Sequence, residues 1–193
     1  MIVWGGEFAC RNDTVDREGI YLASEDNCYH KSTQVRMGDG ALKTLEYLQV
    51  GDRVLIREDM PSEPVMVKIS HEEKSLVEVL KIWYMNHEMG DEGAIIVTPD
   101  HYLYLKSLAD PVLARQSKTG DHLISLSGHT LEIISVESIL APSSDLVQIY
   151  TPSNTFSLGP HSVLASCKSR YDLSDLHGPL SNFIYKHMSE SLP

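Results

Sequence analysis

From residue 28 to about residue 167 the chain consists of short runs in which apolar and polar residues alternate, separated by residues that favour turns. Alternation with a period of two is typical of β-strands that bury one face. Runs of this kind occupy residues 53–56, 65–69, 77–85, 94–97, 102–105 and 146–150. Hairpin turns are predicted at Gly38-Asp39-Gly40 and at Gly90-Asp91-Glu92-Gly93. The pattern therefore predicts an all-β fold.

A six-residue motif occurs twice within this region. Val50-Gly51-Asp52-Arg53-Val54-Leu55 recurs as Thr119-Gly120-Asp121-His122-Leu123-Ile124, 69 positions later, and each copy leads into a predicted strand. A single Gly-Asp turn before a strand is common and carries little information. Two copies in matching contexts predict two duplicated β subdomains related by pseudo-two-fold symmetry.

The two ends of the chain have a different character. Residues 1–27 are polar, end in Ser24-Glu25-Asp26-Asn27, and are predicted to flank the core. Near the other end, apolar residues at helical spacing follow Pro179, which suits a first helical turn. This stripe predicts a short C-terminal helix docked on the core, or an apolar ligand surface; its members are Leu180, Phe183, Ile184, His187 and Met188. We divide the chain into a flanking segment (1–27), a domain (28–168) and an extension (169–193).

Composition excludes several classes of function. The 193 residues are enough for about one domain, with 42% hydrophobic and 22% charged residues. The formal charge of −11 and the lack of a Lys/Arg cluster argue against a nucleic-acid partner. No apolar run reaches the length of a membrane span, and the first six residues do not resemble a signal peptide, so the compartment is left open.

Three features along the chain point to chemistry on its own backbone: Cys28, then Thr98-Pro99-Asp100-His101, then Cys167. A cysteine thiol can attack the carbonyl of the preceding residue and convert that peptide bond into a thioester. A histidine titrating near neutrality can protonate the leaving nitrogen. We therefore predict Asn27–Cys28 as the scissile bond, His101 as the general acid and Thr98 as a hydrogen-bond partner of the scissile peptide. The alternative for Cys28 is a plain cysteine at the start of a strand.

A second segment satisfies the same Thr-x-x-His pattern, Thr119-Gly120-Asp121-His122. Context separates the two. His101 follows the apolar run 94–97, so its ring is predicted to lie in the interior, whereas His122 takes the place of Arg53 in the repeat, where a solvent-facing side chain is expected. We therefore assign the catalytic role to His101.

Taken together, the order and spacing of these motifs resemble the Hint module, the self-cleaving domain shared by Hedgehog precursors and inteins. The resemblance covers residues 28–167, looks closest to the Hedgehog branch, and implies an all-β Hint-like fold of two interleaved subdomains that cleaves itself once, before Cys28. It also implies that Cys167 lies near Cys28, to pair with it or assist the exchange; the alternative is a buried apolar side chain. The motifs that carry it are Cys28, Ser32-Thr33-Gln34-Val35, Gly51-Asp52-Arg53-Val54-Leu55, Thr98-Pro99-Asp100-His101, Gly120-Asp121, Tyr150-Thr151-Pro152 and Val163-Leu164-Ala165-Ser166-Cys167.

The chain departs from the family pattern in three places. Inteins end in a His-Asn pair, whereas Ala165-Ser166-Cys167 stands here, so splicing is not expected. Asn27 replaces the usual glycine before the nucleophile, which is expected to slow the acyl shift. The Asp that helps activate the sterol in Hedgehog precursors aligns with Ser70 and His71, so His71 is a candidate base or a solvated loop residue. Similarly, His161 is a candidate second acid or a turn residue after Gly159-Pro160.

The expected partners follow from these assignments. The substrate is the chain's own N-terminal segment, the protein acts as a monomer, and the thioester is resolved by water, a thiol or an alcohol such as a sterol. No cofactor or metal is predicted, because the sequence has no C-x-x-C, H-x3-H or H-E-x-x-H spacing. Two rival functions stay open: a conventional Cys–His hydrolase with external substrates, and a β-rich interaction module without activity.

Overall fold

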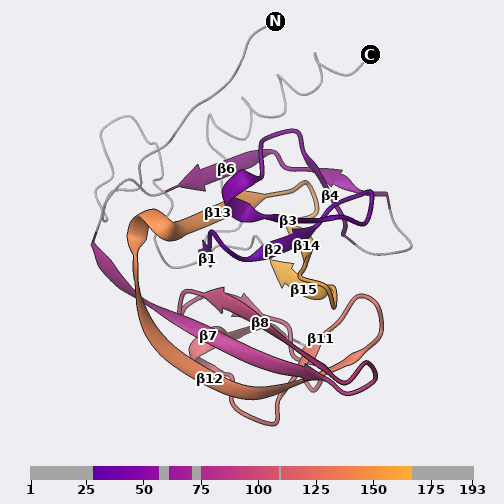
Figure 1. Ribbon diagram of the computed structural model, residues 1–193, viewed down its shortest axis with the longest axis vertical. Coiled ribbons are helices and arrows are strands. Elements are labelled where there is room, and N and C mark those ends of the chain that lie inside the picture. Colours follow the sequence, from indigo (N-terminus) through magenta and orange to yellow (C-terminus); the bar gives the residue numbers. More distant parts are fainter. Residues whose placement is uncertain (1–27, 57–60, 71–74, 109, 167–193) are drawn as a thin grey trace, which may run out of the picture.

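A computed structural model describes residues 28–56, 61–70, 75–108 and 110–166, and every structural statement below concerns these residues. They form short and long β-strands joined by turns, which confirms the predicted all-β class (Figure 1). Three single 3-10 turns are η2 (Leu45–Tyr47), η3 (Ala114–Gln116) and η4 (Ser143–Asp145). The predicted C-terminal helix lies outside the described residues. The strands are β1 (Tyr29–His30), β2 (Gln34–Arg36), β3 (Leu42–Thr44), β4 (Arg53–Val54), β5 (Glu63–Pro64), β6 (Val67–Ser70), β7 (Leu76–Asn86), β8 (Asp91–Val97), β9 (Tyr102–Leu103), β10 (Val112–Leu113), β11 (His122–Ile124), β12 (Thr130–Pro142), β13 (Leu146–Tyr150), β14 (Thr155–Leu158) and β15 (Val163–Ser166).

Most of these strands belong to one large antiparallel sheet. Its seven strands follow the order β11-β12-β7-β8-β1-β13-β6. The long strands β7 and β12 pair along their whole lengths, with one register irregularity between Ile133 and Ser135, and curve together through the lower part of the molecule (Figure 1). A four-stranded sheet, β15-β14-β2-β3, and the pairs β10-β9 and β4-β5 complete the fold. The short strand β1 therefore lies in the middle of the large sheet, between β8 and β13.

Both Gly-Asp motifs adopt the same turn. Gly51 and Gly120 have φ angles of +94° and +90°, in the region that a side chain disfavours. The carboxylate of Asp52 accepts the backbone N–H of the residue three positions before it at 2.8 Å, and Asp121 does the same at 3.0 Å. The repeated motif thus marks a repeated turn, because in both copies the glycine adopts a positive φ and the aspartate carboxylate accepts a backbone N–H of the turn.

The strand pairing extends this repeat over the whole domain and shows that the two copies are interleaved. Strand β6 of the first copy pairs with β13 of the second, and β12 of the second pairs with β7 of the first. The two pairings are equivalent: Ser70 opposite Val147 in β6–β13 occupies the same place as Ser138 opposite Leu80 in β12–β7. Tyr29 pairs with Val97, and Val97 is also the residue equivalent to Tyr29 in the second copy, 68 positions later. A residue that pairs with its own equivalent lies at the symmetry axis, so the pseudo-two-fold axis passes between β1 and β8. The predicted architecture of two pseudo-two-fold-related subdomains is confirmed.

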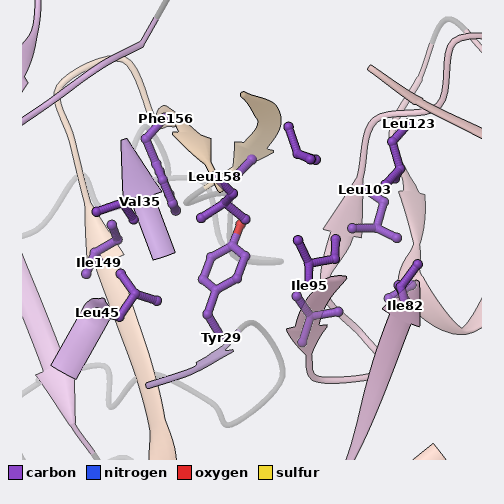
Figure 2. Packing of buried hydrophobic residues seen from close by; sticks show 14 of the residues in the cluster. Tyr29, Val35, Leu45, Ile82, Ile95, Leu103, Leu123, Ile149, Phe156 and Leu158 are labelled. Atoms are coloured by element: carbon purple, nitrogen blue, oxygen red, sulfur yellow. The ribbon is translucent and has the colours of Figure 1, made fainter. Parts of the chain in front are cut away.

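The larger of two hydrophobic clusters joins the two copies, and Tyr29 lies within it at 2% exposure. Figure 2 shows its ring among side chains contributed by both subdomains. The other cluster members labelled there are Val35, Leu45, Ile82, Ile95, Leu103, Leu123, Ile149, Phe156 and Leu158. A second, smaller cluster consists of Cys28, Val79, Ala141 and Leu146. Residues 28 and 29 thus point into two different apolar clusters, as successive residues of a strand do.

One predicted turn is displaced. The β7–β8 hairpin turns at residues 87–90, and β8 begins at Asp91, so the prediction of a turn over Gly90-Asp91-Glu92-Gly93 is wrong by three residues. The side chain of Asn86 explains the shift, because its Oδ1 accepts the backbone N–H groups of Glu88 and Met89 at 3.1 and 3.3 Å. An Asn side chain that satisfies the turn's own donors fixes the turn directly after it.

The equivalence of the two Gly-Asp turns predicts equal effects of mutation. A Cβ at Gly51 or Gly120 would meet no other atom within 4 Å, so alanine adds backbone strain without a clash. We expect Gly51→Ala and Gly120→Ala each to lower the free energy of unfolding by about 1–2 kcal/mol, and the matched Gly→Asn variants to lower it less, because Asn tolerates positive φ. Urea unfolding measures all four. A loss at only one turn would contradict the equivalence.

Candidate active site

Cys28 lies at the entrance to β1 and is fully buried. Its backbone is held by Thr98, the residue that follows β8. The Cys28 N–H donates to Thr98 Oγ1 at 3.0 Å, and the Thr98 N–H donates to the Cys28 carbonyl at 3.0 Å. The Thr98 hydroxyl lies 3.4 Å from that same carbonyl. One threonine therefore contacts both polar backbone atoms of the residue whose nitrogen would leave in a cleavage reaction.

A tight turn carries the chain from Thr98 to His101. The His101 N–H donates to the Thr98 carbonyl at 3.0 Å, and Pro99 takes the position that its fixed φ favours in such a turn. The next segment fastens the turn: the Ala114 N–H donates to the His101 carbonyl at 2.7 Å, and Asp100 pairs with Arg115. The backbone of His101 is thus bonded at both its N–H and its C=O, and the residue is 1% exposed.

Tyr29 completes the connection between Cys28 and His101. Its ring centroid is 4.1 Å from that of His101, with an angle of 61° between the planes. On another side it meets Phe156, with centroids 5.4 Å apart in a similar edge-on arrangement. The structure therefore brings Cys28, Thr98 and His101 into one buried neighbourhood, although their chemical roles stay predictions.

Sequence reasoning singled out neither Tyr29 nor the cluster around His30. Nδ1 of His30 accepts the backbone N–H of Ser32 at 3.2 Å and lies 2.7 Å from its hydroxyl, while Nε2 is 3.6 Å from Asp145. Burial lowers the pKa of His30, although Asp145 opposes this. The hydrogen bond from Lys31 holds the pKa of Asp145 below its usual range. A partly exposed imidazole thus lies two residues beyond Cys28. Finding its cluster from the sequence would have required knowing that residue 145 lies beside β1.

The remaining predicted residues fall into two groups. Asn27, His71 and Cys167 lie outside the described residues. Of the others, His122 is partly exposed in β11 opposite Glu132, as expected for the histidine not assigned a catalytic role. The hydroxyl of Thr119 donates to the Ile134 carbonyl at 3.4 Å, so this second Thr-x-x-His segment supports β12.

His161 belongs to a separate cluster. Its Nε2 is 3.0 Å from the carboxylate of Asp91, its Nδ1 is 3.4 Å from the Tyr84 hydroxyl, and the residue is 2% exposed. Burial raises the pKa of Tyr84. Asp91 is the first residue of β8 and Thr98 follows its last, so His161 meets the end of this strand remote from Cys28. Of its two interpretations, the turn residue agrees with the structure: His161 ties the β14–β15 turn to the β7–β8 hairpin.

Two further results concern ligands and membranes. Among the described residues, no group of three or more His, Cys, Asp or Glu side chains is arranged to hold a metal ion. No helix in the described part of the chain has the length and hydropathy needed to cross a membrane.

No known protein-family model matches the chain. In sequence it is similar to the catalytic subunit of the V-type proton ATPase of Candida tropicalis, with 28% identity over 132 residues; this segment is 66% of the chain but 12% of that protein. In structure it is similar to the gp41-1 intein (TM-score 0.54, 21% identity, 72% of this chain and 98% of that one). It is also similar to a bacterial intein-like domain from Clostridium thermocellum (TM-score 0.56, 18% identity, 72% and 98%), and to a DnaB intein from Synechocystis sp. PCC 6803 (TM-score 0.52, 10% identity, 74% and 99%).

These likenesses establish the fold. Coverage of nearly the whole of each intein, together with the interleaved repeat described above, shows that the chain has the Hint fold found in inteins. At identities of this level a structural likeness carries fold and not activity. They give no support to the narrower resemblance to the Hedgehog branch, which stays a prediction.

The assignment of His161 to a structural cluster can be tested directly. We expect His161→Gln to lower the free energy of unfolding by about 1–3 kcal/mol, the cost of disturbing a buried hydrogen-bonded group, and to leave any cleavage before Cys28 unchanged. Thermal unfolding and mass spectrometry of the same sample measure the two effects. Loss of cleavage in a folded His161→Gln protein would return His161 to the catalytic candidates.

Proposed function

We propose that the chain cleaves its own backbone between Asn27 and Cys28 by an N-to-S acyl shift, once per molecule. The observation that carries the proposal is the pair of contacts between Thr98 and Cys28: the hydroxyl accepts the Cys28 N–H, and the Thr98 N–H holds the Cys28 carbonyl. A buried side chain bonded to the nitrogen of the scissile bond holds that peptide in one geometry throughout the reaction. This preorganisation is the usual contribution of a fold to catalysis.

In the first step the Cys28 sulfur attacks the carbonyl carbon of Asn27. A C–S bond forms and the C–N bond breaks, while His101 gives a proton to the leaving nitrogen and regains one from the Cys28 thiol. A single proton is thus transferred overall, and the product is a thioester with a free amine on Cys28. Thr98 stays bonded to the nitrogen as it changes from amide to amine, since its hydroxyl oxygen accepts an N–H from either.

In the second step an external nucleophile resolves the thioester and releases residues 1–27. We propose water, a thiol or an alcohol as the acceptor, with a sterol the specific expectation of the Hedgehog branch. His71 as its base and Cys167 as a neighbour of Cys28 are parts of the same proposal. Splicing is not proposed, because Ala165-Ser166-Cys167 contains no asparagine to cyclise.

Burial favours this proposal over a conventional Cys–His hydrolase. Cys28, Thr98 and His101 are 0%, 4% and 1% exposed, so they are not open to an external polypeptide substrate, whereas the proposed second step needs only a small nucleophile at the thioester. The convergence of the three residues also favours it over an inactive interaction module, for which no such convergence is needed. The ATPase relative adds no ATPase activity to the proposal, since the similarity covers 12% of that protein.

Intact mass spectrometry of the purified chain tests the proposal. Incubation at neutral pH with dithiothreitol is expected to convert the 21.6 kDa chain into two fragments that divide between Asn27 and Cys28. Cys28→Ala should abolish the reaction, because it removes the only atom able to form the thioester. Repeating the incubation with water alone and with a sterol identifies the acceptor. A folded wild-type chain of unchanged mass under every condition would leave the inactive module as the better interpretation.

Substitution of Thr98 separates its hydroxyl from its packing. Thr98→Val keeps the shape but leaves the buried Cys28 N–H without its acceptor, and we expect thiol-induced cleavage to slow by about 10- to 100-fold, the rate equivalent of 1–3 kcal/mol. Thr98→Ser keeps the hydroxyl and should cleave at close to the wild-type rate. The rates of fragment formation give the comparison; equal rates for the two variants would exclude a role for the hydroxyl.

A further inference from the structure

Tyr29 has two attachments that no other described residue combines. Through its backbone it is bonded to Cys28, and through its ring it contacts His101 at a centroid distance of 4.1 Å. We propose that Tyr29 is the positioning residue that sets the imidazole of His101 against the nitrogen of Cys28. The inference rests on the proposed function, because it concerns the same cleavage reaction.

The backbone of Tyr29 is rigid enough for this task. β1 is paired on both sides, so Tyr29 has Val97 of β8 and Val147 of β13 as cross-strand partners. Its ring is 2% exposed and also packs against Phe156, which is fully buried. A side chain enclosed in this way stays in one rotamer, since any other would need the core to open.

His101 needs such a support. Its backbone is fixed by hydrogen bonds at its N–H and C=O, but these bonds do not by themselves set the two side-chain torsions that place the ring. The second of these torsions has a broad distribution in histidine, so sequence and backbone alone do not determine where the ring nitrogens lie. An aromatic ring 4.1 Å away excludes most orientations and leaves those in which the two planes stay steeply inclined.

The pseudo-two-fold symmetry supplies an independent argument. The position equivalent to Tyr29 is Val97, and the position equivalent to His101 is Thr33, whose hydroxyl donates to the Ile96 carbonyl at 3.5 Å. The half of the fold without the imidazole therefore also lacks the aromatic ring. A ring needed only for core packing would be equally useful in both halves.

The test compares two tyrosines that share their structural setting. Tyr84 is 1% exposed and meets His161 edge-on with centroids 5.6 Å apart, in the cluster remote from Cys28. Tyr29→Met and Tyr84→Met therefore remove the same buried ring beside a buried histidine, with methionine filling much of the volume. Tyr29→Phe keeps the ring. Thiol-induced cleavage is measured across pH 5–9, with thermal unfolding of each variant.

We expect Tyr29→Met to slow cleavage by about tenfold or more, because a misplacement of 1 Å costs up to 10²-fold. Tyr29→Phe should retain the wild-type pH profile, and Tyr84→Met should unfold at a lower temperature while cleaving normally where it is folded. Equal slowing in Tyr29→Met and Tyr84→Met, or a wild-type rate and profile in Tyr29→Met, would overturn the proposal.

Two controls keep the result interpretable. If Tyr29→Met does not fold, Phe156→Leu loosens the same stack from its other side, and an unchanged rate and pH profile in that variant would likewise overturn the proposal. The proposed function fails separately, and visibly, if the wild-type chain does not cleave or if Cys28→Ala still does.

Discussion

The structure depends on the contact between Thr98 and Cys28, because it lies where the two halves of the large sheet meet. β1 contributes two residues to that sheet, yet it joins the strands β11-β12-β7-β8 to β13 and β6. At its start the ladder is replaced by a side chain: the Cys28 N–H donates to the Thr98 hydroxyl. A buried backbone N–H must be paired, so the threonine replaces a strand partner and, in doing so, holds the bond that we propose is cleaved.

Symmetry explains why the proposed chemistry is confined to one half. The turn Thr98-Pro99-Asp100-His101 has its equivalent in His30-Lys31-Ser32-Thr33, where the same backbone hydrogen bond closes the turn at 2.8 Å. Histidine and threonine are exchanged between the two ends of the turn. His30 contacts Ser32 and Asp145 at the surface, and Thr33 bonds a carbonyl of β8. A duplicated backbone therefore supplies two equivalent turns, and side-chain identity decides which can support an acyl shift.

The sequence predicted what depends on local periodicity and on spacing. Alternation located β7, β8 and β13, and the two Gly-Asp copies revealed the repeat, because positive φ and a capping carboxylate are local requirements. It missed the extent of β12, in which the polar residues Ser135, Glu137 and Ser138 interrupt the apolar alternation. The burial of His101 was predicted from the apolar strand before it. The contact of Tyr29 with His101 was not, since it arises from the crossing of β1 and a turn 70 residues away.

The burial of the site determines what kind of reaction it can perform. A closed site gains nothing from binding an external substrate, but it fixes two parts of one chain at contact distance, and such intramolecular arrangements correspond to effective concentrations of roughly 10⁵–10⁸ M. The free energy that orders Cys28, Thr98 and His101 is therefore the free energy of folding itself, distributed over the interleaved sheet and its common core. If the proposed reaction takes place here, its rate is coupled to stability, because Tyr29 belongs to the core and loosening that core would loosen the proposed alignment of Cys28 and His101 as well.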